Sequence, residues 1–184
     1  SNKNFSDNIN YFISPTPDVI NKYKEYTKKN KFNNYGYYFY PEIKPFLSKW
    51  YLSKIEKKLG SEISEEFDKK RQIGENESDI CQLIRQDSIQ EFIVYISQNN
   101  ISLSMCIQPS IFETNPFLIG KKPSLIEYAA FFGSIQIFCY LQINNVKLTP
   151  SLWLYSIHGN NSEIIQILED NDIKPEGDSF LKVF

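Results

Sequence analysis

Few of the side chains that enzymes commonly use for catalysis occur in this chain. His158 is the only histidine, so every histidine-based metal site or acid–base pair would have to form around it. It directly precedes Gly159, near the expected C-terminus of a helix, where the helix dipole stabilises an imidazolium without any catalytic role. We therefore interpret His158 as a structural residue before a catalytic one.

Other reactive patterns are equally weak. The clustered carboxylates of Glu169, Asp170 and Asp172 are typical of a solvated loop face. The sequence contains no glycine-rich phosphate loop, no GxSxG motif and no CxxC pair. We predict that the protein is not an enzyme, binds no metal and needs no cofactor.

The cysteines indicate a reducing compartment. Cys81, Cys106 and Cys139 share no metal-like spacing, and each lies among apolar residues, where a thiol behaves as a small hydrophobic group. The sequence shows neither a signal-peptide pattern nor an apolar run of membrane-spanning length. We expect a cytoplasmic protein without membrane association, and leave a nuclear location open.

Charge is distributed unevenly along the chain. Residues 1–75 carry 14 basic and 10 acidic side chains, net +4, whereas residues 76–184 carry 6 and 12, net −6. An aromatic run at residues 35–40 lies beside lysines and is suited to stacking on the bases of a single-stranded nucleic acid. Packing against the first repeat is the preferred interpretation. A nucleic-acid-associated adaptor using this half is the alternative function, although a nucleic acid is the less expected partner.

An internal repeat dominates the C-terminal half. Residues 123–149 align without gaps on residues 150–176, an offset of 27, and a more diverged unit at 78–103 precedes them. The identical pairs are Pro123/Pro150, Ser124/Ser151, Leu125/Leu152, Tyr128/Tyr155, Leu141/Leu168, Asn144/Asn171 and Lys147/Lys174. An insertion at 104–122 should be ordered, because it contains apolar residues that need burial, namely Ile107, Ile111, Phe112, Phe117 and Leu118.

Each copy carries start and stop signals for two helices. Ser124 followed by Glu127 predicts a capping box, and Gly133 can adopt the left-handed conformation that ends a helix. We expect Gly159 to end the equivalent helix of the next copy, and Asn161 or Ser162 to cap the helix after it. In the diverged unit, Ser78 and Asp87 are the expected helix starts.

Residues 1–75 are expected to form a helical N-terminal cap. A helix should run from the Thr16-Pro17-Asp18 start to about Asn30, and Ser61 should start a polar helix that reaches about Arg71. Between them, the strongest amphipathic pattern of the chain predicts one helix with a single apolar stripe, made of Ile43, Phe46, Leu47, Trp50, Tyr51, Ile55 and Leu59.

The segment from Leu125 to Phe138 resembles the middle of an ankyrin repeat, in which a Leu, an Ala-Ala pair, a Gly and an Ile-Val pair hold the helices together. Their places are taken by Ile126, Ala129-Ala130, Gly133 and Ile137-Phe138. Most of the chain resembles divergent ankyrin-repeat proteins of unassigned function that are expanded in a parasitic flagellate protist. The resemblance implies an all-α, ankyrin-like helical-repeat solenoid that binds other proteins and has no known catalytic residues. The 27-residue period is shorter than the usual 33, so the projecting hairpin must be trimmed.

In the ankyrin alignment five residues of the first helices fall at or beside variable positions on the concave face. We predict them as a protein-binding surface, because partly exposed aromatic residues are favoured interface anchors. For Phe131 or Phe132, packing against the insertion is the alternative. They are Tyr128, Phe131, Phe132, Tyr155 and His158.

The end of the chain resembles the start of a fourth unit. Asp178 aligns with the cap residues Ser124 and Ser151, so residues 177–184 are expected to open another first helix. Four apolar residues follow, which half a unit cannot bury: Phe180, Leu181, Val183 and Phe184. We predict a homodimer formed through this end.

Overall fold

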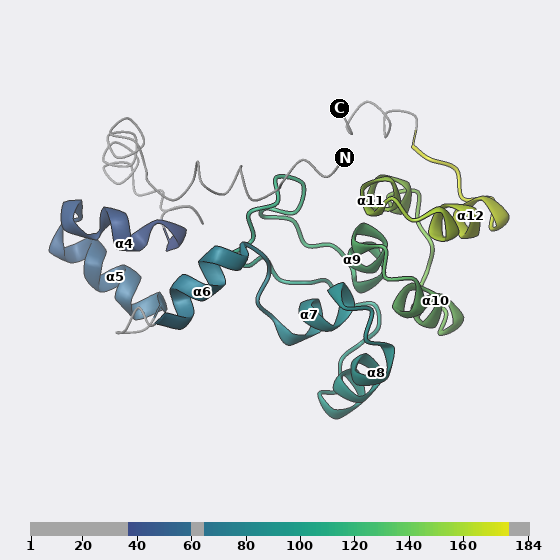
Figure 1. The fold of residues 1–184 in the computed structure, drawn as a ribbon, viewed down its shortest axis with the longest axis horizontal. Coiled ribbons are helices and arrows are strands. Elements are labelled where there is room, and N and C mark those ends of the chain that lie inside the picture. Colours follow the sequence, from purple (N-terminus) through teal and green to yellow (C-terminus); the bar gives the residue numbers. More distant parts are fainter. Residues whose placement is uncertain (1–36, 60–64, 177–184) are drawn as a thin grey trace. The chain divides into compact units, whose positions relative to one another are not determined.

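The computed structural model describes residues 37–59 and 65–176 of the 184-residue chain. Over these residues the regular secondary structure is helical, apart from one isolated β-bridge between Cys106 and Ser124 (Figure 1). The prediction of an all-α protein is confirmed for this part of the chain. The predicted helix at 16–30, the Ser61 cap and residues 177–184 lie outside the described residues.

The chain divides into two units. One consists of Ser1–Glu75 with Ser110–Gly120, and the other of Asn76–Pro109 with Lys121–Phe184. The first boundary coincides with the one expected between residues 75 and 76. The central part of the insertion, in contrast, belongs to the N-terminal unit, so the chain passes from one unit to the other three times.

The described helices of the N-terminal unit are α4 (Tyr40–Ile43), the 3-10 helix η1 (Lys44–Phe46), α5 (Lys49–Leu59) and α6 (Glu65–Ile73). The prediction of one continuous apolar stripe over this region is wrong. Pro45 ends α4, because proline cannot continue a helix, and Leu47 is extended with φ −88° and ψ 145°. The helix therefore restarts in a new phase, which leaves Phe46 51% and Trp50 58% exposed while Ile55 is buried.

The aromatic run packs inside this unit. Tyr37, Tyr38, Phe39 and Tyr40 are all buried, and the Tyr38 hydroxyl donates a hydrogen bond of 2.9 Å to the carbonyl oxygen of Arg71. Burial raises the pKa of the Tyr38 and Tyr40 hydroxyls, so both stay protonated at neutral pH. For residues 37–40 burial favours packing over base stacking, but their described partners lie within the N-terminal unit, and packing against the first repeat stays a prediction.

Arg71 joins α4 to α6 in the same unit. Its guanidinium donates from Nη2 to the Glu42 carboxylate at 2.5 Å and lies over the ring of Tyr38, 5.1 Å from the ring centroid. Its side chain is 11% exposed. The planar guanidinium satisfies a carboxylate and an aromatic face together, which a lysine ammonium does less well.

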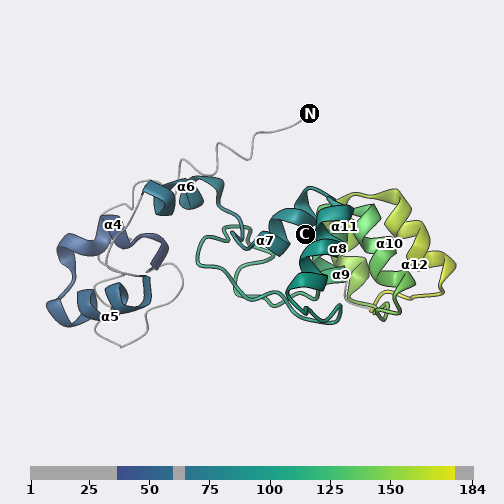
Figure 2. The ribbon, with the colours of Figure 1, turned by 90° about the horizontal axis from the view of Figure 1, so that it is seen from below.

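The described residues of the second unit form three helix pairs. They are α7 (Asp79–Arg85) with α8 (Ile89–Gln98), α9 (Leu125–Phe132) with α10 (Ile135–Ile143), and α11 (Leu152–Gly159) with α12 (Ser162–Asp170). Helix α9 contacts α7 and α11, and α10 contacts α8 and α12. The pairs therefore stack in chain order, with the first helices in one layer and the second helices in the other (Figures 1 and 2).

Residues in the left-handed conformation recur at equivalent places in the three pairs. One ends the first helix of each pair, and another follows each second helix. The first set is Asp87, Gly133 and Asn160, with φ of 49°, 68° and 47°, and the second is Asn100, Asn145 and Asp172, with φ of 55°, 63° and 52°. The equivalence indicates that all three pairs share one backbone plan.

The helix starts agree with the sequence in part. The capping box is confirmed: the backbone N–H of Ser124 donates to the Glu127 carboxylate at 2.8 Å, and the Ser124 hydroxyl accepts from the Glu127 N–H. Asn161 caps α12, as predicted, by accepting from the backbone N–H groups of Glu163 and Ile164. Ser78 stands before α7 but makes no capping hydrogen bond, and its hydroxyl donates instead to the Asn76 side chain.

The turns of neighbouring pairs are linked by side-chain hydrogen bonds. Asp87 does not cap its own α8; its carboxylate accepts from the backbone N–H groups of Gln136 and Ile137, both at 3.0 Å, and so caps α10 of the next pair. Ser134 donates to the carbonyl oxygen of Ile84 at 2.5 Å. At the equivalent position of the following pair, Asn161 donates back to the carbonyl oxygen of Gly133 at 3.1 Å. These bonds fix the register of the stack.

Helix α11 ends at Gly159, as predicted, and the left-handed residue that follows it is Asn160. A Cβ atom at Gly159 would overlap the carbonyl oxygen of Ala130 and crowd the backbone N–H of Gly133 at 3.1 Å. Glycine is needed here because α11 approaches the end of α9 backbone to backbone.

The insertion is ordered, as predicted. Backbone hydrogen bonds from Ile107 to Pro123, at 2.8 Å, and from Leu125 to Met105, at 3.3 Å, close its base. Within the N-terminal unit, Thr114 binds the carbonyl oxygen of Gly74 through both its N–H and its hydroxyl. Of the apolar residues expected to need burial, three are buried and two half-buried: Ile107, Phe112 and Leu118, then Ile111 and Phe117.

Candidate protein-binding surfaces

Four of the five residues predicted to bind a partner form one cluster on α9 and α11. The ring centroids of Tyr128 and Phe132 are 4.7 Å apart, those of Phe131 and Phe132 are 5.0 Å apart, and those of Phe131 and His158 are 5.4 Å apart. The fifth residue, Tyr155, lies on α11. Burial, with smaller contributions from the Glu127 carboxylate and Cys106, raises the pKa of its hydroxyl to about 12. The alignment therefore brought together residues that are true neighbours.

Their exposure differs from the expected one. Tyr128, Phe131 and Tyr155 are buried, with exposed fractions of 1%, 9% and 8%. The expectation that they present rings to a partner is wrong, because α9 is packed between α7 and α11, and the Tyr128 hydroxyl accepts a hydrogen bond of 2.8 Å from Arg85. Only Phe132, half-buried, and His158, exposed, retain surface.

His158 lies in the last turn of α11, as expected, but not as a stabilised cation. Partial burial lowers the pKa of its imidazole, and the nearby Lys121 charge lowers that pKa further. The lowered pKa favours the neutral ring over the imidazolium.

The remaining candidates for chemistry are dispersed. Glu169, Asp170 and Asp172 are exposed, and their described contacts are local, such as the hydrogen bond of 2.8 Å from Gln166 to Asp170. The part of the chain that the structure describes contains no cluster of three or more His, Cys, Asp or Glu side chains able to hold a metal ion.

Among the described helices, none is long and apolar enough to cross a membrane. Of the cysteines, Cys106 is exposed, which corrects its expected apolar surroundings.

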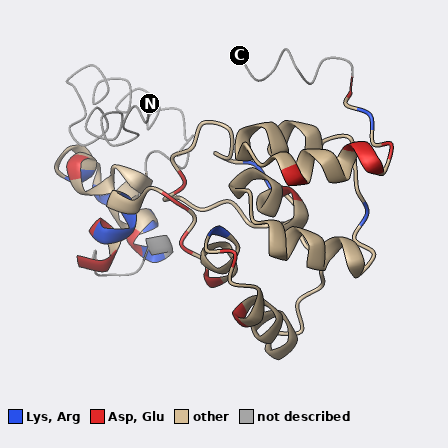
Figure 3. Cartoon of the chain, turned by 45° about the vertical axis from the view of Figure 1, so that its right-hand side comes forward, with Lys and Arg blue, Asp and Glu red and all other residues tan. Residues whose placement is uncertain are grey.

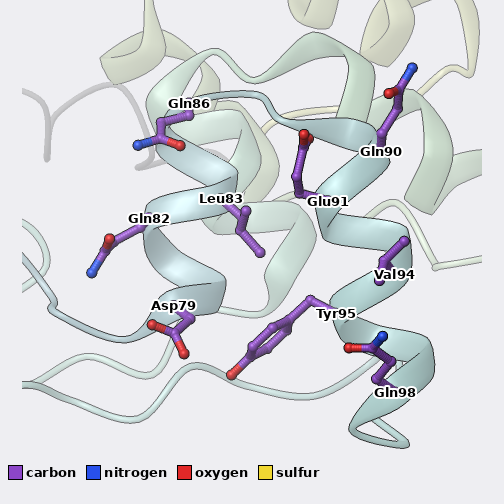
Figure 4. Close-up of a pocket in the computed structure, with 9 residues that line it drawn as sticks. All are labelled: Asp79, Gln82, Leu83, Gln86, Gln90, Glu91, Val94, Tyr95 and Gln98. Atoms are coloured by element: carbon purple, nitrogen blue, oxygen red, sulfur yellow. The ribbon is translucent and has the colours of Figure 1, made fainter.

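An open groove of about 580 Å³ is lined by residues of both helices of the first pair, α7 and α8 (Figure 4). Leu83 and Tyr95 project into it from the two helices, and Val94 stands at its edge. The other six lining residues are polar: Asp79, Gln82, Gln86, Gln90, Glu91 and Gln98. We call this site the end groove, because it lies on the first pair of the stack and all nine of its lining residues come from that pair.

The polar character of the end groove breaks the pattern of the repeat. Counting 46 positions onward, Asp79, Gln82 and Glu91 correspond to Leu125, Tyr128 and Ile137. These residues of the second pair are buried, and so are their counterparts in the third pair, Leu152, Tyr155 and Ile164. The first pair therefore has polar side chains where the later pairs have core residues, which suits a solvated end of a stack.

The polar residues at these three positions of the first pair are the signal that the sequence interpretation missed. The repeat alignment already contained the three polar replacements, but their meaning depends on knowing that the equivalent residues are buried in the later pairs. In residues 37–59 and 65–176 neither the Asp79 nor the Glu91 carboxylate has a hydrogen-bond or ion-pair partner. Of the glutamines, Gln82 donates to the carbonyl oxygen of Glu77 at 2.9 Å. The groove thus offers unused polar groups around an apolar floor.

A second surface lies on α5 of the N-terminal unit. Trp50 is 58% exposed, with the Lys54 ammonium 5.0 Å from its ring centroid, and Lys49 and Lys57 are exposed on the same helix. A cationic helix face with an exposed indole is suited to an anionic partner. The predicted self-association residues at 180–184 lie outside the described residues.

Comparison with protein-family models, with curated proteins and with solved structures finds no match to this chain.

Proposed function

We propose that this chain is a non-enzymatic protein-interaction scaffold of ankyrin type, a helical solenoid that binds a segment of a partner protein in the end groove. The end groove is the observation that carries the proposal: it is open, rigidly framed by two helices, and combines an apolar floor with unused polar groups. Binding sites between proteins commonly have this composition. Support for the ankyrin-like solenoid comes from the stacked helix pairs and from the left-handed residues at equivalent positions.

The rigidity of the groove also favours binding. The register of the first and second pairs is held by the Asp87 carboxylate, the Ser134 hydroxyl and the Arg85 guanidinium, each of which bonds across to the neighbouring pair. A preorganised site loses less conformational freedom on binding than a loop would.

Partner capture tests the proposal. The full chain, tagged, would be used to capture proteins from native cell extract after nuclease treatment, in parallel with Val94→Arg, which places a bulky cation at the groove edge. Ile143→Arg is the matched control, because Ile143 is 78% exposed on α10, outside the groove. We expect Val94→Arg to lose the partner and Ile143→Arg to retain it. Equal capture by all three chains would refute the end groove as the binding site.

A nucleic-acid-associated role is the second candidate, and the exposed Trp50 beside Lys54 on α5 is the observation that favours it. If this role is correct, nuclease treatment should release the proteins captured by the tagged chain. The double variant Trp50→Ala with Lys54→Gln should also weaken binding to a single-stranded oligonucleotide. Retention of the partner after nuclease would argue against this role.

Self-association through the C-terminal end also remains a proposal. Light scattering of the full chain beside a chain truncated after Lys174 tests it. A dimer that becomes monomeric on truncation supports the proposal, and two monomers would refute it.

A further inference from the structure

The end groove is an anionic site. Its two charged lining groups are the carboxylates of Asp79, at the start of α7, and Glu91, in the first turn of α8, and both side chains are exposed. Among the residues that the structure describes, no lysine or arginine lines it. The only cation on the two helices is Arg85 (Figure 3). It faces the second pair, where it donates to the Tyr128 hydroxyl at 2.8 Å and lies over the Phe132 ring, 5.9 Å from the centroid.

The two carboxylates lie at different levels of the groove. Figure 4 shows the Asp79 carboxylate at the end of the groove where the Tyr95 ring lies, whereas the Glu91 carboxylate points towards the opposite end. Leu83 lies between the two levels and provides an apolar surface.

We propose that the end groove recognises a basic segment of a partner protein, with a lysine or arginine side chain on either side of an apolar residue. This inference rests on the proposed function and specifies its partner. The two cations pair with Asp79 and Glu91, the apolar residue packs on Leu83, and the glutamine amides, which are both donors and acceptors, hydrogen-bond polar groups of the segment.

An apolar occupant fits the groove poorly. A hydrophobic helix, or the apolar face of a second copy, would bury the two carboxylates without a partner, and an unpaired buried charge is strongly unfavourable. An acidic segment would place like charges side by side. Charge complementarity therefore selects a basic segment.

Fluorescence anisotropy with a labelled peptide tests this inference on the full chain. The probe is an amphipathic helical peptide with one face that carries a leucine flanked by a lysine on each side, and the comparison peptides carry glutamine or glutamate instead of lysine. The groove variant combines Asp79→Asn with Glu91→Gln. The matched control combines Glu169→Gln with Asp172→Asn, which removes the same charge from exposed positions at the end of α12. Circular dichroism spectra verify that each variant is folded.

We expect the lysine peptide to bind the native chain more tightly than the glutamine peptide. The groove variant should weaken lysine-peptide binding roughly 2- to 30-fold, the loss of two solvent-accessible ion pairs, and leave glutamine-peptide binding unchanged. The control variant should bind like the native chain. Equal binding of the lysine and glutamine peptides, or equal weakening by the groove and control variants, would overturn the inference.

The failure of this inference is distinguishable from the failure of the proposed function. If Val94→Arg abolishes partner capture while the groove variant binds the lysine peptide as the native chain does, the end groove binds a partner that is not selected by charge. If Val94→Arg has no effect on capture, the groove is not the partner site.

Discussion

Asp87 should contribute to stability through a helix that belongs to the next pair. Its carboxylate accepts hydrogen bonds from two of the first N–H groups of α10, and its own backbone is left-handed, with φ 49°. Asp87→Ala removes both acceptors and places alanine in a conformation that it adopts poorly. Loss of a helix cap costs about 1 kcal/mol, and the left-handed alanine about 1 kcal/mol more. We therefore expect Asp87→Ala to lower the free energy of unfolding by about 2 kcal/mol.

Two further substitutions separate these causes. Asp87→Asn keeps a side-chain oxygen that can accept from α10 and tolerates the left-handed conformation, so it should cost less than about 0.5 kcal/mol. Asp87→Gly removes the acceptor but relieves the backbone, so it should cost about 1 kcal/mol. The expected order of stability is therefore native, Asn, Gly and Ala.

Tryptophan fluorescence during urea unfolding is the assay. The chain has two tryptophans, Trp50 in the N-terminal unit and Trp153 in α11, whose indole N–H donates to the carbonyl oxygen of Ile173 at 2.6 Å. In a Trp50→Phe background, Trp153 reports on the stacked pairs alone, and Trp50 is exposed enough to tolerate the change. If Asp87→Ala and Asp87→Asn unfold at the same urea concentration as the native chain, the cap between neighbouring pairs makes no contribution and the reasoning is wrong.

Three other perturbations address packing and ionisation. Gly159→Ala should destabilise the stack by roughly 1–2 kcal/mol in the same assay, because overlap with the Ala130 carbonyl outweighs the higher helix propensity of alanine; a stabilised variant would contradict the close approach. Burial, with the Glu127 carboxylate and Cys106 adding to it, raises the pKa of Tyr155 to about 12, so the unfolded chain loses this proton first and stability should fall as pH rises from 10 to 12. Tyr155→Phe should remove up to 2–3 kcal/mol of that fall, and identical pH profiles would refute it. The single histidine resonance in NMR should titrate below pH 6.5 and move upward in Lys121→Gln; a midpoint above 6.5 would contradict the neutral His158.

The sequence by itself determined the features that depend on neighbouring residues. The capping box of Ser124 and Glu127, the left-handed Gly133 and the Asn161 cap all involve groups within four positions of one another, so residue type and spacing suffice to predict them. The helix pairs follow from these signals and from the repeated apolar residues. The order of the insertion also followed, since its apolar residues could not remain in water.

The tertiary structure alone decided which of these residues are exposed. Tyr128 and Tyr155 match the variable positions of an ankyrin helix, yet the packing of α9 between two other helices buries Tyr128, and Tyr155 is buried on α11. Gly159 is the last residue of its helix, as the sequence predicted, but the need for glycine there is set by a carbonyl 29 positions earlier in the chain, at Ala130.

The end groove also needed the three-dimensional arrangement. Asp79, Gln82 and Glu91 are ordinary polar residues of amphipathic helices until the second pair shows that their equivalents form the core. Spacing along one helix determines which residues share a face. Which of these faces is covered by another element depends on residues far away in the chain. In this protein, that coverage decides whether equivalent positions belong to the core or to the end groove.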